Sequence, residues 1–181
     1  GVLEVIQDAD AIIIGPGSLY TDVLPNLLVK NVAKAIKDSK AIKIYIANIM
    51  TQPGQTDNYS ISDHLEALFS HTGKEIIDYC MADTGEIVPE YVRKYNKEGQ
   101  DIVLPDIDKA TKKGIRIIQK NLSKIEDGYI RHNSDVIASS IMELVCNDLK
   151  FRDKESTPEY LLINSILEDE LKRERKVNEK I

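Results

Sequence analysis

Residues 10–26 of the chain read DAIIIGPGSLYTDVLPN. The apolar run at 11–14 ends at a Gly-Pro-Gly turn, a pattern typical of a strand that is buried on both faces of a parallel sheet. Pro25 suits the first position of a helix, and apolar residues at near-helical spacing follow it to about residue 39. The stretch therefore predicts a strand, a loop and a helix, which is the repeating unit of an α/β fold.

The same order of elements repeats farther along the chain. Isoleucines alternate with other residues over 42–46, and a polar loop follows them before the next helical pattern begins. Further strands are expected at 76–81, 102–104 and 115–118, and further helices at 62–71 and 89–99. Strands and helices that alternate in this way predict an α/β fold with a doubly wound, mainly parallel sheet.

The carboxyl-terminal part of the chain has a different pattern. Apolar residues at helical spacing predict a helix over 134–149, which we expect to close the core of the α/β domain. From residue 150 onward the sequence becomes a charged linker, and Pro158 then begins an amphipathic helix. We therefore expect a domain over 1–149 and a helical extension over 150–181.

Composition narrows the class of protein. The chain has 181 residues, 42% of them hydrophobic and 30% charged, and no apolar run approaches the roughly 20 residues of a membrane-spanning helix. The net charge of -6 does not favour direct binding to nucleic acid. Cys80 and Cys146 lack the paired spacing of a zinc site or a disulfide framework. We expect a cytoplasmic protein with buried thiols.

The loop after the first predicted strand has the chemistry of an anion site. Gly15 and Gly17 allow backbone to approach a ligand closely, while Ser18 and Thr21 offer hydroxyl groups beside exposed amides. No Gly-Lys-Ser/Thr follows, so the loop is not a P-loop, and the three spaced glycines of a dinucleotide site are also missing. The alternative is a tight strand-to-helix turn in which Ser18 caps the helix.

The loop after the second predicted strand is rich in hydrogen-bonding side chains. Around Pro53-Gly54 stand Thr51, Gln52, Thr56, Asp57 and Asn58. Uncharged polar groups at this density suit the hydroxyls, amides and ring edges of a sugar or a base. The alternative is a surface loop of turn-forming residues. Asp57 is the better candidate for a metal ligand, with a turn-stabilising role as its alternative.

Three runs of this sequence resemble a known family. DAIIIGPGSLYTDVLPNLLV at 10–29, ANIMTQPGQTDNYSISDH at 47–64 and IRH at 130–132 are similar to the CofD-like superfamily. That superfamily includes 2-phospho-L-lactate transferases and the bacterial gluconeogenesis-factor (YvcK-like) proteins, and the resemblance is strongest to the latter. It covers roughly residues 1–150.

The resemblance implies a Rossmann-like domain that binds nucleotide-type ligands. The gluconeogenesis-factor branch implies a cytoplasmic, nucleotide-sugar-binding regulator of carbon metabolism and cell shape. UDP-N-acetylglucosamine is the nucleotide sugar with which this expectation can be tested. The transferase branch implies instead a metal-dependent transfer of a phosphorus-containing group, for which Mg²⁺ would be the cofactor. No nucleophile–base pair is evident in the sequence, so we expect binding without catalysis. A protein-interaction scaffold is the third alternative.

The sequence departs from the family pattern in several places. Whole members begin with a Gly-rich strand-turn-helix and with acidic residues that hold the metal in the transferases. Because both features are missing here, the chain resembles the carboxyl-terminal half of the family domain. Gln55 stands where the family often has Glu, and Asp22 where Ser is common.

Both lines of reasoning assign candidate ligand-binding residues. Phosphate is assigned to Gly15, Gly17 and Ser18, and the sugar or base to Asn48, Thr51, Gln52 and Thr56. Arg131 would hold a diphosphate with its guanidinium fork, or else be a surface charge. By family analogy Tyr95 would stack on a ring, or else be a half-buried helix residue. We also expect a homodimer through the apolar stripe of the terminal helix, with packing on its own domain as the alternative.

Overall fold

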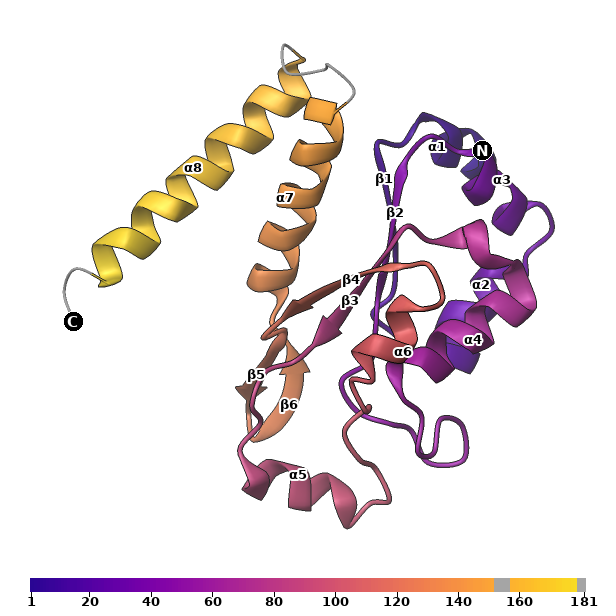
Figure 1. The fold of residues 1–181 in the computed structure, drawn as a ribbon, viewed down its shortest axis with the longest axis vertical. Coiled ribbons are helices and arrows are strands. Elements are labelled where there is room, and N and C mark those ends of the chain that lie inside the picture. The colour runs from indigo at the N-terminus through magenta and orange to yellow at the C-terminus, as the bar shows by residue number, and fades with distance from the viewer. Residues whose placement is uncertain (152–156, 179–181) are drawn as a thin grey trace. The chain divides into compact units, whose positions relative to one another are not determined.

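The computed structural model describes residues 1–151 and 157–178 (Figure 1). The chain divides into two compact units, Gly1–Asn133 and Ser134–Ile181, and each is described by itself. The division falls before the helix that the sequence analysis assigned to the α/β domain. The family-domain boundary at residue 149 stays a prediction.

The first unit is built on a parallel sheet. Its strands are β1 (Ala11–Ile14), β2 (Ile42–Ile46), β3 (Tyr79–Asp83) and β4 (Arg116–Lys120), in the order β1-β2-β3-β4. The register aligns Ile13 with Ile44 and Ile44 with Tyr79. The α/β, Rossmann-like fold class is confirmed, because the apolar runs form parallel strands. The run at 11–14 was expected to be buried on both faces, but β1 is an edge strand in which Ile13 is 39% exposed.

Helices connect the strands. They are α1 (Val2–Asp8), α2 (Leu24–Leu27), α3 (Val32–Asp38), α4 (Ile61–Thr72), α5 (Pro89–Asn96) and α6 (Ile107–Thr111). Short helical turns occur at Leu19–Val23 and Lys74–Ile76. A capping box begins α4, in which the Ser60 N–H donates to Asp63 Oδ2 at 2.9 Å. This cap fixes the point at which the second loop ends.

The core of this unit lies on one face of the sheet. Ile14, Tyr45 and Cys80 point to that face and form one cluster with Leu65 and Leu68 of α4. Figure 1 shows α2, α3, α4 and α6 along the same side of the strands. Right-handed crossovers between successive neighbouring strands place these helices on one side, which explains the arrangement, whereas α5 lies apart from them (Figure 1).

Three expectations about the elements need correction. The single helix expected from Pro25 is split into α2 and α3, because Asn31 between them adopts a left-handed φ of 69°. Residues 102–104 form isolated bridges from Ile102 to Met50 and from Leu104 to Ser60, not a strand of the sheet. The third strand begins at Tyr79, three residues later than predicted, because a short helical turn precedes it.

A small hairpin follows the parallel sheet in the chain. β5 (Ser123–Glu126) pairs in antiparallel with β6 (Tyr129–His132). Asp127 and Gly128 both have positive φ, as a two-residue hairpin turn requires. The Asp-Gly pair was the signal that could have identified this turn.

The second unit is a pair of helices, α7 (Ser134–Phe151) and α8 (Pro158–Asn178), which contact each other. The thiol of Cys146 on α7 lies 3.9 Å from Asn164 Oδ1 on α8. Leu161, Leu162 and Ile166 are exposed on α8. The charged linker expected after residue 150 falls mainly outside the described residues. Among the described helices, none has both the length and the apolar character needed to cross a membrane.

Candidate functional site

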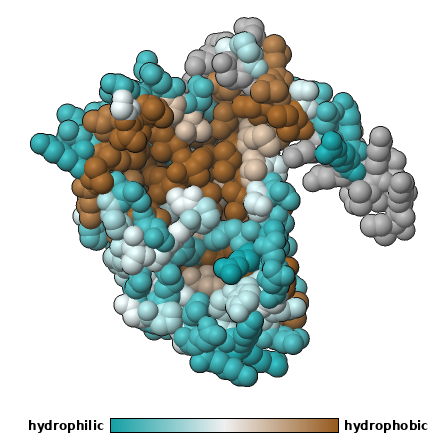
Figure 2. Space-filling view, turned by 180° about the vertical axis from the view of Figure 1, so that it is seen from behind, coloured by the Kyte–Doolittle hydropathy of each residue, from teal (hydrophilic) through white to brown (hydrophobic). Residues whose placement is uncertain are grey.

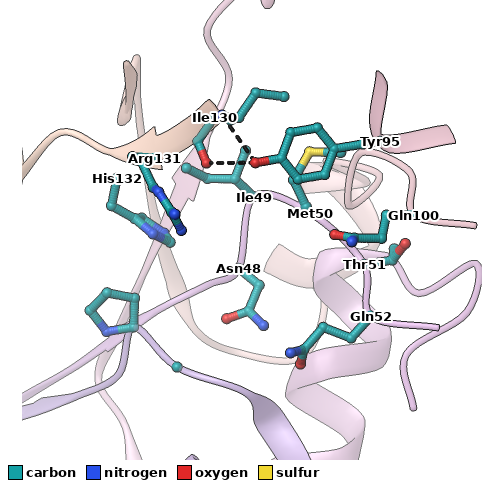
Figure 3. Close-up of a pocket in the computed structure, with 12 residues that line it drawn as sticks. Asn48, Ile49, Met50, Thr51, Gln52, Tyr95, Gln100, Ile130, Arg131 and His132 are labelled. Carbon is teal, nitrogen blue, oxygen red and sulfur yellow. Dashed lines mark hydrogen bonds between the residues drawn. The ribbon is translucent and has the colours of Figure 1, made fainter. Parts of the chain in front are cut away.

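A pocket of about 310 Å³ lies where the β1 and β2 chains leave the sheet (Figure 3). Its walls come from both loops, from the segment that ends α5 and from β6. They consist of Pro16, Gly17, Asn48, Ile49, Met50, Thr51, Gln52, Tyr95, Gln100, Ile130, Arg131 and His132. Of the predicted ligand-binding residues, six therefore meet here: Gly17, Asn48, Thr51, Gln52, Tyr95 and Arg131. Gly15, Ser18 and Thr56 do not line it.

Gly15 shapes the first loop from behind the pocket. Its φ is +86°, and a Cβ added at this position would lie 2.9 Å from the backbone oxygen of Ile46. Glycine is therefore required both by the backbone conformation and by the approach of β2. The turn that follows through Pro16 brings Gly17 to the pocket wall.

Ser18 joins the first loop to the second. Its hydroxyl donates to Gln52 Oε1 at 2.6 Å and lies 3.1 Å from Gln55 Oε1. Its backbone N–H donates to Asp22 Oδ2 at 2.9 Å. The hydroxyl and the amide that were assigned to phosphate are thus already engaged within the protein. Ser18 fixes the position of Gln52, which does line the pocket.

Threonine hydroxyls shape the second loop. Thr51 Oγ1 accepts a hydrogen bond from the Asp101 N–H at 2.8 Å, and the Thr51 N–H donates to Asp101 O at 2.7 Å. Thr56 is fully buried, and its Oγ1 accepts from the Gln52 N–H at 2.9 Å. The loop is therefore tied both to itself and to the segment after α5, which places Asn48 and Gln52 on the wall.

The hairpin strand β6 is fastened to α5. The Tyr95 hydroxyl donates to Ile130 O at 3.3 Å and accepts from the Ile130 N–H at 3.1 Å, as the dashed lines of Figure 3 show. Lys94 Nζ donates to Gly128 O at 3.0 Å and lies 3.7 Å from the centre of the Tyr129 ring. Tyr95 thus lines the pocket and at the same time positions the strand that carries Arg131.

Arg131 and His132 form the end of β6. The Arg131 side chain is exposed, and Figure 3 shows it beside the His132 ring. His132 Nε2 lies 3.1 Å from Ala47 O, so this nitrogen carries the proton that the carbonyl accepts. Burial lowers the pKa of His132 below its ordinary value. His132 is therefore a neutral residue at pH 7, and it ties the hairpin to the end of β2.

The charge of the pocket is low. Arg131 is the only lining residue with a formal charge at pH 7, and amides of Asn48, Gln52 and Gln100 make up much of the polar wall. Met50 and Ile49 add apolar surface. A single guanidinium among neutral donors and acceptors suits one anionic group attached to a body rich in hydroxyls or amides.

The candidate metal ligand lies outside the pocket lining. Asp57 Oδ2 accepts a hydrogen bond from the Gly54 N–H at 2.7 Å, which is a turn-stabilising contact. In the part of the chain that the structure describes, no group of three or more His, Cys, Asp or Glu residues could hold a metal ion. His64 is fully buried, its Nδ1 lies 2.9 Å from Ser60 O, and its ring meets the edge of Tyr59.

Some lining residues were missed at the level of sequence. Gln100 reaches the pocket because Asp101 pairs with Thr51, a contact across 50 positions that leaves no local pattern. His132 lies within the quoted IRH run but was not assigned a place in the site. Ile49, Met50 and Ile130 lie within the quoted family runs and Pro16 in the Gly-Pro-Gly turn, but none of them was assigned to the site.

These features define a class of protein. A Rossmann-like sheet with a polar pocket at the carboxyl ends of its strands is typical of proteins that bind small, nucleotide-type ligands. Residues 1–123 match the family described as 2-phospho-L-lactate transferase CofD, and the chain belongs to this family.

Relatives of known name extend this result. The chain is 45% identical over 142 residues to the gluconeogenesis factor of Halalkalibacterium halodurans, covering 78% of this chain and 44% of that protein. It is 40% identical over 173 residues to a putative gluconeogenesis factor of Clostridium acetobutylicum, covering 96% of this chain and 38% of the relative. The chain thus spans less than half the length of these relatives.

A solved structure agrees with the fold. An X-ray structure of a protein from Bacillus halodurans has a TM-score of 0.77 and 43% sequence identity to this chain. The match covers 78% of this chain and 45% of the other. The resemblance to the gluconeogenesis-factor branch of the CofD-like superfamily is therefore confirmed.

Proposed function

We propose that this chain forms part of a cytoplasmic regulatory protein of the gluconeogenesis-factor type that binds a nucleotide sugar of the UDP class and does not turn it over. The observation that carries the proposal is the lining of the pocket, in which one cation, Arg131, stands among neutral amides. A UDP-sugar has the matching chemistry, since a diphosphate joins two ring systems that are rich in carbonyls and hydroxyls.

Each part of such a ligand has a counterpart in the pocket. The guanidinium of Arg131 presents a fork of N–H donors to the diphosphate. Amides of Asn48, Gln52 and Gln100 offer donors and acceptors to sugar hydroxyls and to the base. The ring of Tyr95 and the side chain of Met50 supply apolar contact area. The names of the relatives support a role in gluconeogenesis, and a role in cell shape is part of the same proposal.

The principal alternative is a metal-dependent transferase of phosphorus-containing groups, which the description of the matching family favours. Such chemistry requires carboxylates that hold Mg²⁺ against the phosphates. The residues that line the described pocket include no carboxylate, and the metal-holding carboxylates of the transferases lie in the part of the family domain that this chain lacks, so the NMR experiment below decides between the two. A purely scaffolding role, the other alternative, predicts no saturable binding of a small molecule.

Calorimetric titration of UDP-N-acetylglucosamine tests the proposal, with Arg131→Ala as the variant and Arg93→Ala as the control. Arg93 is exposed on α5 and lies outside the pocket, so both variants lose the same charge. Loss of a charge-assisted, forked contact costs about 1.5–3 kcal/mol, or roughly 10- to 150-fold in affinity. We expect this loss only for Arg131→Ala.

Phosphorus NMR of the same mixtures, with Mg²⁺ and then with EDTA, separates the alternatives. An unchanged ligand spectrum together with saturable binding supports the proposal. Steady formation of a new phosphorus compound that requires Mg²⁺ would establish the transferase. No heat with any nucleotide sugar would remove the ligand-binding proposal altogether.

A further inference from the structure

The hairpin that carries Arg131 places a second cation beside it. In the register of β5 and β6, Lys124 lies opposite Arg131 and Glu126 lies opposite Tyr129. Side chains alternate between the two faces of a strand, so these four residues share one face of the hairpin. Directly opposed side chains of an antiparallel pair have Cβ atoms about 4.5–5.5 Å apart. Lys124 and Arg131 are therefore neighbouring like charges, an arrangement that destabilises the pairing of the two strands.

Positive charge is in excess on this face. Lys124 Nζ lies 3.1 Å from Glu126 Oε1, whereas Arg131 forms an ion pair with no carboxylate of the described residues. The guanidinium carbon of Arg131 lies 5.4 Å from the centre of the Tyr129 ring, and Lys94 Nζ lies 3.7 Å from the same centre. The contacts of this face therefore join three cations to one carboxylate. An added anion would relieve the repulsion between these cations.

The ion pair between Lys124 and Glu126 is weak. The two side chains are 34% and 55% exposed, and exposed pairs contribute little to stability because water screens them. Figure 2 shows a mainly hydrophilic surface around α5, at the bottom of the view, from which Lys94 reaches the hairpin. The ammonium of Lys124, on its flexible four-carbon stem, can therefore leave Glu126 for a stronger anion at small cost.

The proposed ligand brings such an anion to Arg131. The diphosphate of a nucleotide sugar carries more than one negative charge, whereas Arg131 is the single cation among the residues that line the pocket. The amides of Asn48, Gln52 and Gln100 donate hydrogen bonds to a ligand but carry no charge. A phosphate that the Arg131 guanidinium holds comes close to the cross-strand neighbour of this residue, which is Lys124.

We propose that Lys124 is a second ligand-binding cation of this site and that Glu126 holds it before the ligand binds. On binding, the Lys124 ammonium leaves the Glu126 carboxylate and joins the Arg131 guanidinium at the diphosphate. The ligand then relieves the repulsion between the two cations, and the Glu126 carboxylate competes with the ligand for Lys124. The inference rests on the proposed function, because it adds a residue to that site.

Calorimetry with UDP-N-acetylglucosamine tests the two residues separately. Lys124→Met removes the ammonium and keeps most of the stem, and we expect it to weaken binding about tenfold. Glu126→Gln removes the carboxylate and keeps the shape of the side chain, and we expect it to tighten binding about two- to fivefold. The two changes therefore move the affinity in opposite directions. An ion pair that only supported the hairpin would instead weaken binding in both variants.

Matched controls come from a second ion pair and from simpler ligands. Lys113 and Glu66 form an ion pair outside the lining of the pocket. Lys113→Met and Glu66→Gln repeat the two charge changes there, and we expect each to alter the affinity less than about twofold. Uridine carries no phosphate, so Lys124→Met should leave its affinity unchanged. Inorganic pyrophosphate carries no nucleoside, and its binding should respond to both hairpin variants as the nucleotide sugar does. Circular dichroism confirms that each variant is folded.

The outcomes separate this inference from the proposed function. Saturable binding of UDP-N-acetylglucosamine that both hairpin variants weaken, or that neither changes, would overturn the role of Lys124 and keep the nucleotide-sugar site. An equal loss of uridine affinity in Lys124→Met would also overturn that role, because no phosphate would then be involved. Binding of pyrophosphate with the two opposite effects, but no binding of the nucleotide sugar, would keep the paired cations and remove the proposed function. No binding of either ligand would remove both.

Discussion

Replacement of Tyr95 by Phe distinguishes two roles that the pocket gives to this residue. The ring lines the pocket, and the hydroxyl makes hydrogen bonds of 3.3 and 3.1 Å to the carbonyl and the N–H of Ile130. Phe keeps the ring and removes both hydrogen bonds. If the hydroxyl positions β6, and with it Arg131, then Tyr95→Phe must lower both stability and affinity although the aromatic contact is retained.

The structure sets the size of the effect. Each neutral hydrogen bond contributes about 0.5–1.5 kcal/mol, and Ile130 is buried, with 5% of its surface exposed, so its backbone groups lose a partner that water replaces poorly. We therefore expect a loss of about 1–2 kcal/mol in the free energy of unfolding. The ratio of the attached hairpin to the detached hairpin then falls by about 5- to 30-fold. This factor is the upper limit for the loss of ligand affinity.

Urea denaturation and calorimetry with UDP-N-acetylglucosamine measure the two effects. Tyr91→Phe is the matched control, because Tyr91 lies on the same helix and does not line the pocket. We expect that variant to change stability by less than about 0.5 kcal/mol. The reasoning is refuted if Tyr95→Phe has wild-type stability and affinity while Tyr95→Ala loses binding, because the ring alone would then act.

Two further predictions concern backbone strain and pH. Gly15→Ala should lower stability by about 2–3 kcal/mol, because a Cβ would meet Ile46 O at 2.9 Å at a φ of +86°. Gly54 also has a positive φ, +75°, but a Cβ there would meet no atom within 4 Å, so Gly54→Ala should lower stability by only about 1 kcal/mol. Equal melting temperatures for the two variants would contradict the clash at Gly15. Burial lowers the folded pKa values of His64 and His132, so the unfolded chain binds more protons and stability must fall as pH decreases below about 6.5. Urea titrations between about pH 7.5 and 5 test this in wild type and in His64→Gln, where the loss should be smaller; a pH-independent free energy in the wild type would contradict it.

The strands of the sheet were predictable because local sequence decides them. The run AIII at 11–14 and the isoleucines of 42–46 are apolar enough to indicate strands. Burial on both faces holds for β2 but not for the edge strand β1, in which Ile13 is 39% exposed. The position of the pocket followed from the same pattern, since loops at the carboxyl ends of parallel strands converge. Both loops that were singled out for this reason contribute to its wall.

The remaining features depend on contacts that are distant in the sequence. β5 reads Ser-Lys-Ile-Glu, which has too few apolar residues to indicate a strand, and it forms because β6 pairs with it. The break at Asn31 depends on a single left-handed residue within an otherwise helical pattern. Gln100 enters the pocket through the pairing of Asp101 with Thr51. None of these leaves a periodic signal.

The density of polar residues in a loop therefore overstates how many of them contact a ligand. The Thr56 hydroxyl accepts from the Gln52 backbone, and the Ser18 hydroxyl donates to Gln52 Oε1 at 2.6 Å. Because Oε1 is engaged in this way, the amide nitrogen is the group of Gln52 that is left to donate to a ligand. Arg131 also has only donors. Arg131 and the Gln52 amide nitrogen therefore present donors, which fit the phosphate oxygens of the proposed ligand, whereas Asn48 and Gln100 offer both donors and acceptors.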